Sequence, residues 1–312
     1  MSAPSSPAPL RGLALIALAA ISWGTTGSVT TVLVAHAGAH PLVIGAARLL
    51  VGAVVLLLTA RALAGSVRVA RADAWRVVLM GLSMAAFQAT YFTAVTLTGI
   101  AITALLAICS APLMIAALAA VFLGERLTAS VAGALALGVA GTALLLAGPR
   151  TAADFSPRFV AGVLLALGAG LAYALYVVVG KAALRRSAPL PLAAANFALA
   201  AAVMLPALAL PDAFLQVALG WPWLLYLGVV TTAGAYALYT LGLRDVSASA
   251  AGIGSLLEPL TATALGVVVF GERLGAVGGA GAALLLGALA LLASAEGRRE
   301  GLRRGSAVSR RG

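Results

Sequence analysis

The chain has 312 residues, of which 62% are hydrophobic and only 9% are charged. Soluble domains carry about a quarter charged residues, so this composition excludes a water-soluble globular fold. The formal net charge is +11, but the arginines flank apolar runs instead of forming one basic face, which favours membrane topology over nucleic-acid binding as the reason for the charge.

Ten apolar runs, each about as long as a helix that crosses a bilayer, follow one another along the chain. We therefore predict an all-α integral membrane protein with ten transmembrane helices. The predicted spans are Leu13–Ala35, Pro41–Ala60, Ala74–Leu97, Ala101–Leu123, Thr128–Ala147, Phe159–Gly180, Leu190–Leu210, Trp221–Leu243, Ser249–Phe270 and Ala276–Ser294. The single cysteine, Cys109, rules out an intrachain disulfide and is predicted to be a buried structural thiol.

Both ends of the chain are polar. Residues 1–10 are rich in Ser, Pro and Ala, and we expect them to be disordered, while residues 295–312 form a basic tail. The first apolar run, with Arg11 before it and Ala35-His36-Ala37 after it, has the outline of a signal peptide. Its unusual length, and the repeat to which it belongs, favour a helix that is retained.

The Lys and Arg residues predict the orientation, because they concentrate in cytoplasmic loops. If the N-terminus is cytoplasmic, sixteen of the 20 basic residues lie inside and three lie outside, with Arg48 within a span. The inside set is Arg11, Arg61, Arg68, Arg71, Arg76, Arg126, Lys181, Arg185, Arg186, Arg244 and the six arginines of the tail; the outside set is Arg150, Arg158 and Arg273. We expect a multi-pass protein of the bacterial cytoplasmic membrane with both termini in the cytoplasm.

The sequence repeats itself at an offset of 147 residues. Ala111-Pro112-Leu113, followed by Gly124-Glu125-Arg126-Leu127, returns as Glu258-Pro259-Leu260, followed by Gly271-Glu272-Arg273-Leu274. We expect two five-helix units, residues 11–148 and 158–294. Because five is an odd number, the two units must insert upside down relative to each other. Inverted repeats are typical of secondary transporters, whose substrate site lies near the midplane between the repeats.

Glu258 is the one carboxylate near the middle of a predicted span. A carboxylate at that depth costs about 2.5–3.5 kcal/mol even on a lenient insertion scale, so it faces the protein interior or a watery cavity. Pro259 removes a backbone donor and is expected to bend the helix there. We predict that Glu258 binds a proton or the substrate; the alternative is a structural glutamate paired beside a proline kink.

Arg48 lies about seven residues into the second predicted span. It could bind a substrate carboxylate, counterbalance Glu258, snorkel to the surface or bond a backbone carbonyl. Other polar or aromatic side chains within spans could line a cavity or bridge helices. The candidates are Gln88, Tyr91, Asn196, Tyr236, Tyr239, and the pair Trp23 and Tyr173, which hold equivalent positions in the two units.

The two Gly-Glu-Arg-Leu segments are interpreted as structural. Gly124 and Gly271 suit helix C-caps, and Glu125 and Glu272 then favour the positive N-terminal end of the next helix. Pro112 and Pro259 are assigned a structural role as well. Small residues in the fifth and tenth spans allow close packing, either within the chain or at a homodimer face.

No catalytic constellation is found in the sequence. His36 and His40 have a spacing that can chelate metal, but no carboxylate or thiol is near them, so no metal site is predicted. No phosphate-binding loop and no nucleophile–base pair is present. We therefore predict no enzyme activity and no cofactor.

Together these features resemble the EamA-type branch of the drug/metabolite transporter superfamily. The resemblance rests on the early Ser22-Trp23-Gly24, Arg48 in the second span, Glu258-Pro259, and the two Gly-Glu-Arg-Leu segments, and it covers about residues 11–294. It implies a central cavity that excludes the fifth and tenth helices. It also implies proton-linked or exchange-type movement, often export, of amino acids, related metabolites or drugs. Ala111 stands where the second unit has Glu258, so only one acidic site is available.

The function predicted from the sequence is secondary transport of small metabolites, with a small-molecule substrate and membrane lipids as the partners. The protein is expected to act as a monomer or homodimer, with no nucleic acid. The alternatives are a membrane enzyme that acts on lipid-linked substrates, and a passive channel or scaffold subunit. The enzyme would require clustered acidic or histidine residues, and the channel would not accumulate substrate against a gradient.

Overall fold

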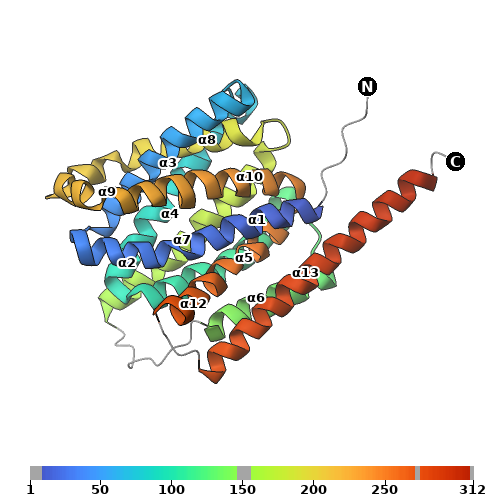
Figure 1. Cartoon of the computed structure of the whole chain (residues 1–312). Coiled ribbons are helices and arrows are strands. Elements are labelled where there is room, and N and C mark those ends of the chain that lie inside the picture. The colour runs from blue at the N-terminus through green and yellow to red at the C-terminus, as the bar shows by residue number, and fades with distance from the viewer. Residues whose placement is uncertain (1–8, 146–155, 271–274, 310–312) are drawn as a thin grey trace.

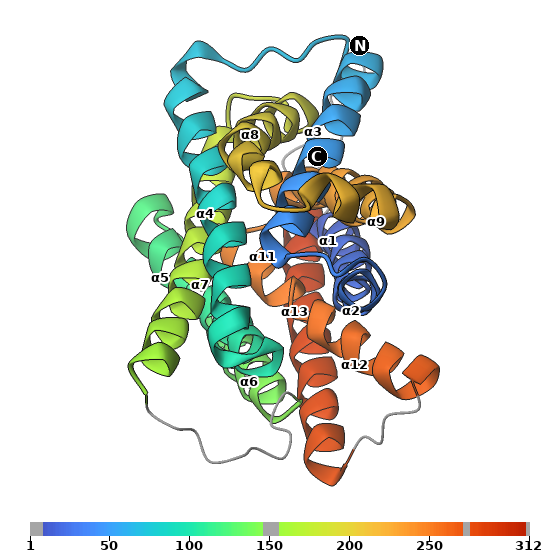
Figure 2. The ribbon, with the colours of Figure 1, turned by 90° about the vertical axis from the view of Figure 1, so that its left-hand side faces the viewer.

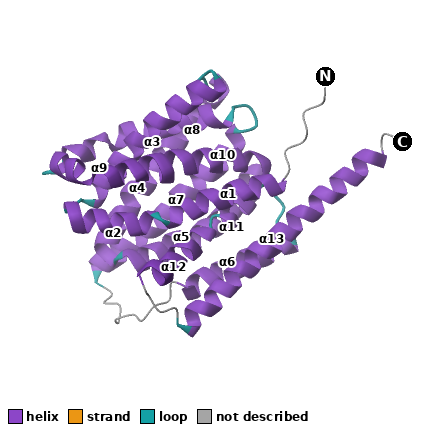
Figure 3. Cartoon of the chain, viewed as in Figure 1, coloured by secondary structure: helices purple, strands orange, loops and turns teal. Residues whose placement is uncertain are grey.

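The computed structural model describes residues 9–145, 156–270 and 275–309 (Figure 1). Throughout this part of the chain the regular structure is helical, with no strand (Figure 3). The helices are α1 (Pro9–Gly24), α2 (Thr26–Ala37), α3 (Pro41–Ala64), α4 (Ala74–Thr98), α5 (Ile100–Leu123), α6 (Ala129–Leu145), α7 (Pro157–Ala183), α8 (Pro189–Met204), α9 (Ala213–Gly228), α10 (Ala235–Asp245), α11 (Ala248–Gly254), α12 (Leu257–Phe270) and α13 (Ala276–Ser309), with the 3₁₀ turns η1 (Arg71–Asp73) and η2 (Leu205–Ala209) and the π-helix η3 (Val229–Gly234).

Each predicted span falls on a helix, so the predicted all-α membrane fold is confirmed. Within the described ranges, nine helical stretches are long and apolar enough to cross a membrane, and Ala129–Leu144 is a shorter apolar helix. The helical structure differs from the prediction at the two ends. Helix α1 begins at Pro9, inside the segment expected to be disordered, and α13 continues to Ser309 through the basic tail.

Three of the spans are interrupted within the described residues. The first breaks at Thr25, whose N–H and hydroxyl both donate to the carbonyl of Ser22, at 3.2 and 2.7 Å. The eighth widens into η3, because the hydroxyls of Thr231 and Thr232 both donate to the carbonyl of Leu227, at 2.9 and 2.8 Å. The ninth breaks between α11 and α12.

One end of the helix bundle collects four connections between helices. The hydroxyl of Ser187 donates to Asp73 at 2.7 Å, joining the α7–α8 and α3–α4 connections. Lys181 donates to the carbonyl of Leu243 at 2.8 Å, and Glu125 accepts from the N–H of Ala248 at 2.7 Å, which brings the α5–α6 and α10–α11 connections to the same end. We call this the basic end. Its described Lys and Arg residues are Arg11, Arg61, Arg68, Arg71, Arg76, Arg126, Lys181, Arg185, Arg186 and Arg244.

The opposite end, which we call the far end, collects the α2–α3, α4–α5 and η2–α9 connections and the start of α7. His40 caps α3 by accepting from the N–H of Leu42 at 3.2 Å, and its backbone N–H donates to the side-chain oxygen of Gln216 in the first turn of α9 at 2.9 Å. Gly162 near the start of α7 lies against Thr98 at the end of α4. The one basic residue described near this end is Arg158.

Helices α6 and α13 pack against each other at one side of the bundle (Figures 1 and 2). The contact is close at Gly141, where an added Cβ would lie 2.8 Å from the carbonyl oxygen of Gly281 and from the N–H of Leu285. Gly133 is also at this contact, opposite Leu291. Gly141 and Gly133 therefore serve packing within the chain, whereas an added Cβ at Gly279 or Gly287 in α13 would meet nothing within 4 Å.

Candidate functional site

The break in the ninth span places Glu258 at the first turn of α12. The N–H of Glu258 donates to the carbonyl of Ser255 at 3.0 Å, and Pro259 has no N–H to extend the helix backward. The bend expected from Pro259 is thus present. A carboxylate in the first turn of a helix is also favoured by the positive end of the helix dipole.

The corresponding helix of the first half, α5, continues unbroken through Pro112. A proline is therefore not enough to break the ninth span. The second half has Gly252, Gly254 and Ser255 where the first half has better helix formers, and α11 ends among these residues. The sequence difference between the two units thus explains why only the unit with Glu258 has a break at this position.

Glu258 is surrounded by protein, yet part of its surface is accessible. Helix α1 passes directly beside it at Gly24. An added Cβ at Gly24 would lie 2.8 Å from the backbone oxygen of Glu258 and 2.6 Å from Cβ of Thr261. Gly24 is therefore required for α1 to approach α12, and this explains the glycine that follows Trp23.

Arg48 is buried in α3, with only 7% of its surface exposed, so it does not snorkel. Its Nε donates to the hydroxyl of Thr232 at 3.1 Å, and its Nη2 donates to the hydroxyl and the carbonyl of Thr231 at 3.3 and 3.4 Å. Both threonines belong to the π-helix η3. The widened turn therefore supplies the oxygen atoms that satisfy a buried cation.

Arg48 and Glu258 interact electrostatically across the two halves of the chain. They are not joined by a direct ion pair; the described ion pairs are Arg76–Asp73 and Arg244–Asp245. Tyr236 lies within electrostatic range of both charges, and Tyr91 lies within range of Glu258. The two opposite charges thus remain apart, with tyrosines near them.

Aromatic rings from α1, α4, α7, α8 and α10 form a cluster next to these charges. The ring centroid of Trp23 lies 4.8 Å from that of Tyr236, 5.2 Å from that of Tyr239 and 6.4 Å from that of Tyr173. Offset and edge-on contacts at such distances are favourable for aromatic pairs. The cluster consists of Trp23, Phe87, Tyr91, Tyr173, Tyr176, Phe197, Tyr236 and Tyr239.

One hydroxyl of the cluster contacts the ninth span, and other polar atoms of the cluster are buried without a partner among the described residues. The hydroxyls of Tyr173 and Ser255 lie 3.5 Å apart, which connects α7 to the helix break before Glu258. The indole N–H of Trp23 is buried and has no hydrogen-bond partner within the described residues. A buried donor without a partner is costly, and the Tyr239 hydroxyl of the same cluster is buried and unpartnered among the described residues as well.

The structure brings seven of the nine candidate residues into this region: Glu258, Arg48, Trp23, Tyr173, Tyr91, Tyr236 and Tyr239. Asn196 is not part of this region; its Nδ2 donates to the carbonyl of Leu192 in the same helix, α8, at 2.6 Å. Gln88 is buried in α4. Cys109 is half-buried in α5, with its thiol facing the carbonyl of Val139.

Sequence reasoning missed Thr231, Thr232 and Ser255. Two adjacent threonines between glycines in an apolar span were a usable signal, because threonine hydroxyls bond preceding backbone carbonyls and distort helices. Nothing in the local sequence indicates that these hydroxyls face Arg48, which lies 184 residues earlier.

Gly124 ends α5 in the left-handed conformation with φ of 66°, as a C-cap glycine does. Glu125 differs from the expectation, because it binds the N-terminus of α11 in the other half of the chain and not that of the following α6. The expectation considered only neighbouring helices, whereas the tertiary fold brings a distant helix start closer. Gly271 and Glu272 lie outside the described residues.

The fold and this region define a class: a multi-pass helical membrane protein with a buried arginine bound to a π-helix and a carboxylate at a helix break in the ninth span. The model of the EamA-like transporter family matches residues 10–147 and again residues 160–294. The chain therefore belongs to the EamA-like transporter family and is a membrane transporter.

Two named transporters and one solved structure are similar to this chain. The chain is 37% identical over 282 residues to "Uncharacterized transporter YwfM" of Bacillus subtilis, covering 90% of this chain and 93% of that protein. It is 34% identical over 198 residues to "Uncharacterized transporter" of Archaeoglobus fulgidus, covering 63% and 68%. A solved crystal structure that is 22% identical has a TM-score of 0.78 and covers 93% of this chain and 98% of its own, which shows a shared fold.

Proposed function

We propose that this chain is a secondary active transporter of small metabolites that have both charged and apolar parts, such as amino acids or drug-like compounds. It moves them across the cytoplasmic membrane, in the direction of export, coupled to protons or to exchange. It works as a monomer or homodimer with membrane lipids around it, without enzyme activity and without nucleic acid.

The observation that carries the proposal is the separation of Arg48 and Glu258. Arg48 and Glu258 act on each other electrostatically without forming a direct ion pair, so each could bind the opposite charge of a molecule that carries both. The Arg48 guanidinium suits a carboxylate, and Glu258 suits an amine or a proton. The aromatic cluster beside them suits the apolar part of such a molecule.

Proton coupling follows from the same carboxylate. A charged Glu258 favours a state in which water reaches it, whereas a neutral Glu258 is easier to enclose. A proton on Glu258 therefore shifts the equilibrium toward the closed state. It can do so because it binds the open and the closed state with unequal affinity. Arg48 acts electrostatically on this carboxylate, and the carboxylate in turn acts on Tyr91 and Tyr236.

An inverted arrangement of the two halves would provide the two states. The interrupted first, eighth and ninth spans are all near the charges, as in carriers whose broken helices form the site at the repeat interface. Rocking of one half against the other would then expose this region first to one side of the membrane and then to the other.

The decisive experiment compares the full-length protein with Glu258→Gln in vesicles that carry an imposed pH gradient. The glutamine keeps the shape of the protonated side chain and cannot release a proton. We expect normal membrane levels, loss of at least about tenfold in gradient-driven transport across a metabolite panel, and retained exchange at equal pH. Right-side-out and inverted vesicles give the direction.

The matched control is Asp212→Asn, which neutralises an exposed carboxylate before α9. The backbone of Asp212 is left-handed, with φ of 58°, and asparagine tolerates this conformation. This variant should transport like the wild-type protein. Unchanged pH-driven transport in Glu258→Gln would reduce Glu258 to a structural partner of the proline kink, and failure of the wild-type protein in substrate counterflow would favour a channel.

A further inference from the structure

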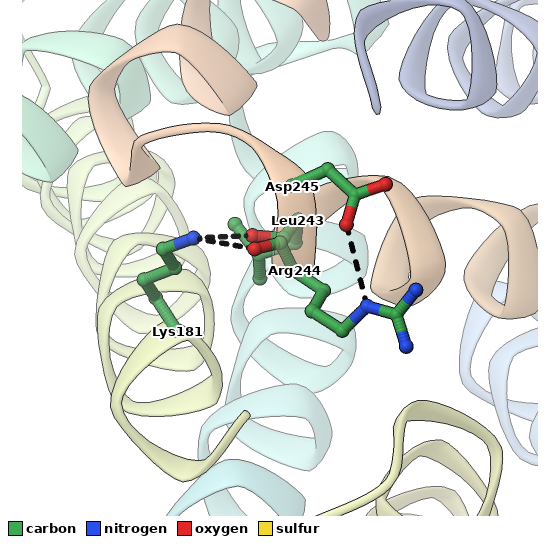
Figure 4. Close-up of polar contacts among 4 residues, drawn as sticks. All are labelled: Lys181, Leu243, Arg244 and Asp245. Carbon is green, nitrogen blue, oxygen red and sulfur yellow. Dashed lines mark hydrogen bonds and ion pairs between the residues drawn. The ribbon is translucent and has the colours of Figure 1, made fainter. Parts of the chain in front are cut away.

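The connection between α10 and α11 at the basic end is held from two sides. On one side, Nζ of Lys181 donates to the carbonyls of Leu243 and Arg244 at 2.8 and 3.0 Å (Figure 4). Figure 4 also shows Arg244 turned toward Asp245, with Nε 3.3 Å from Oδ1. Lys181 belongs to α7, so this clamp joins two helices of the second half.

On the other side, the connection is held by a carboxylate of the first half. Oε1 of Glu125 accepts from the N–H of Ala248 at 2.7 Å, and Oε2 accepts from the N–H and the hydroxyl of Ser249 at 3.1 and 2.8 Å. Ser247 caps the same helix by accepting from the N–H of Ala250 at 3.1 Å. The start of α11 therefore receives its hydrogen-bond acceptors from Ser247 and from a residue 123 positions earlier.

Helix α11 leads from this contact directly to Glu258. Every residue of α11 is buried. An added Cβ at Gly252 would lie 3.0 Å from Cδ1 of Ile115, so α11 rests on α5. The helix ends at Gly254, the next residue Ser255 contacts Tyr173, and α12 begins at Leu257 with Glu258 in its first turn. A movement of α11 away from α5 therefore moves the helix break beside Glu258.

We propose that Glu125 is a latch that keeps the basic end closed. It holds α11 against α5 and is released when this end opens during transport. Release leaves the N–H groups of Ala248 and Ser249 without acceptors, a cost that water can offset only once it enters between α5 and α11. The latch rests on the proposed transport function, because it assigns Glu125 to one of the two states of the carrier.

The test measures opening by thiol labelling of the full-length protein in vesicles, in a Cys109→Ala background. The reporter is Ile115→Cys on α5, at a position that is fully buried against Gly252. The probe is a small charged methanethiosulfonate reagent. We expect Glu125→Gln to raise the labelling rate by roughly tenfold, which corresponds to about 1.4 kcal/mol, close to the lower limit for the loss of one hydrogen bond to a charged group.

Two controls separate a latch from general loosening. Asp73→Asn removes another buried carboxylate of the basic end, bound to Ser187 and not to α11, and should leave the labelling of Ile115→Cys unchanged. A second reporter, Ala94→Cys, is fully buried in α4 toward the far end and should not label faster in Glu125→Gln. Faster labelling of both reporters would overturn the latch, because it would mean that the whole fold is loosened.

A milder variant keeps the proposal testable if Glu125→Gln does not reach the membrane. Ser249→Ala removes one of the three hydrogen bonds and should raise the labelling of Ile115→Cys by a smaller factor. No increase in either variant would overturn the latch. The labelling measurement needs no substrate, so it tests the role of Glu125 separately from transport. Faster labelling of Ile115→Cys in Glu125→Gln, together with no metabolite transport by the wild-type protein, would refute the transport proposal and leave the role of Glu125 intact.

Discussion

Arg48 is a buried cation whose hydrogen bonds go to neutral partners. Its neighbours Thr231 and Thr232 remain satisfied without it, because their hydroxyls also donate to the carbonyl of Leu227. Burying an arginine without a direct counter-ion costs free energy that an apolar side chain would not. A residue that the fold does not need for stability is a candidate for substrate binding.

We therefore predict that Arg48→Met leaves the thermal stability of the purified protein unchanged or raises it. The same variant should bind a carboxylate-bearing substrate roughly tenfold to a hundredfold more weakly, since hydrogen bonds to charged groups contribute about 1.5–3 kcal/mol. Melting curves and binding titrations with the substrate found in the vesicle screen check both parts. A large loss of stability with full affinity would show that Arg48 is structural.

The helices approach one another most closely where glycine faces a neighbouring backbone or branched side chain. An added Cβ at Gly52 in α3 would lie 2.4 Å from Cγ2 of Thr232, and one at Gly228 in α9 would lie 2.4 Å from Cβ of Val51. These two glycines bring α3 against η3 and set the distance across which Arg48 reaches Thr232. Close approach through small residues is the usual means of helix packing in lipid.

Gly52→Ala should therefore destabilise the protein by about 1–3 kcal/mol, as overpacking does in a dense core. Gly168→Ala is the matched control, because an added Cβ at this position in α7 meets nothing within 4 Å. That variant should be neutral or stabilise the protein by up to about 1 kcal/mol through helix propensity. Melting temperatures in detergent measure both, and equal effects would contradict the proposed role of Gly52.

In the whole molecule, most of the described Lys and Arg residues gather at one end of the bundle, apart from Arg48, which is buried within α3, and Arg158, which lies at the far end. The contacts of Glu125, Lys181 and Asp73 hold four connections between helices at that basic end. Positive charge is retained on the cytoplasmic side when helices insert. The basic end is therefore expected to face the cytoplasm.

Reporter fusions after Gly312 and in the Leu184–Pro189 connection should both give a cytoplasmic signal. A fusion in the Leu210–Ala213 connection at the far end should give a periplasmic signal, because its chain segment lies beside His40 at the other end of the bundle. Activity of a cytoplasmic and of a periplasmic reporter at each site measures the orientation. A periplasmic signal from either of the first two fusions would contradict the predicted topology.

The sequence by itself determined the fold class and the position of each span, because bilayer length and apolar composition constrain helices more strongly than any packing detail. It also identified Glu258, Arg48 and the aromatic residues, since a charge or ring within an apolar run needs no structure to be noticed. Pro259 marked the position of the break beside Glu258 but did not determine it, because α5 stays helical through Pro112 and only the second half has glycines before the proline.

Only the tertiary structure decided which of these residues meet and which serve their own helix. Asn196 satisfies a carbonyl in its own helix, Thr232 meets Arg48 across 184 residues, and Glu125 holds a helix start 123 residues away. Such contacts depend on how helices cross, which is set by glycines such as Gly24 and Gly52 at points of close approach. The physical reason is that a hydrogen bond between distant segments leaves no periodic pattern along the chain, whereas span length and backbone breaks do.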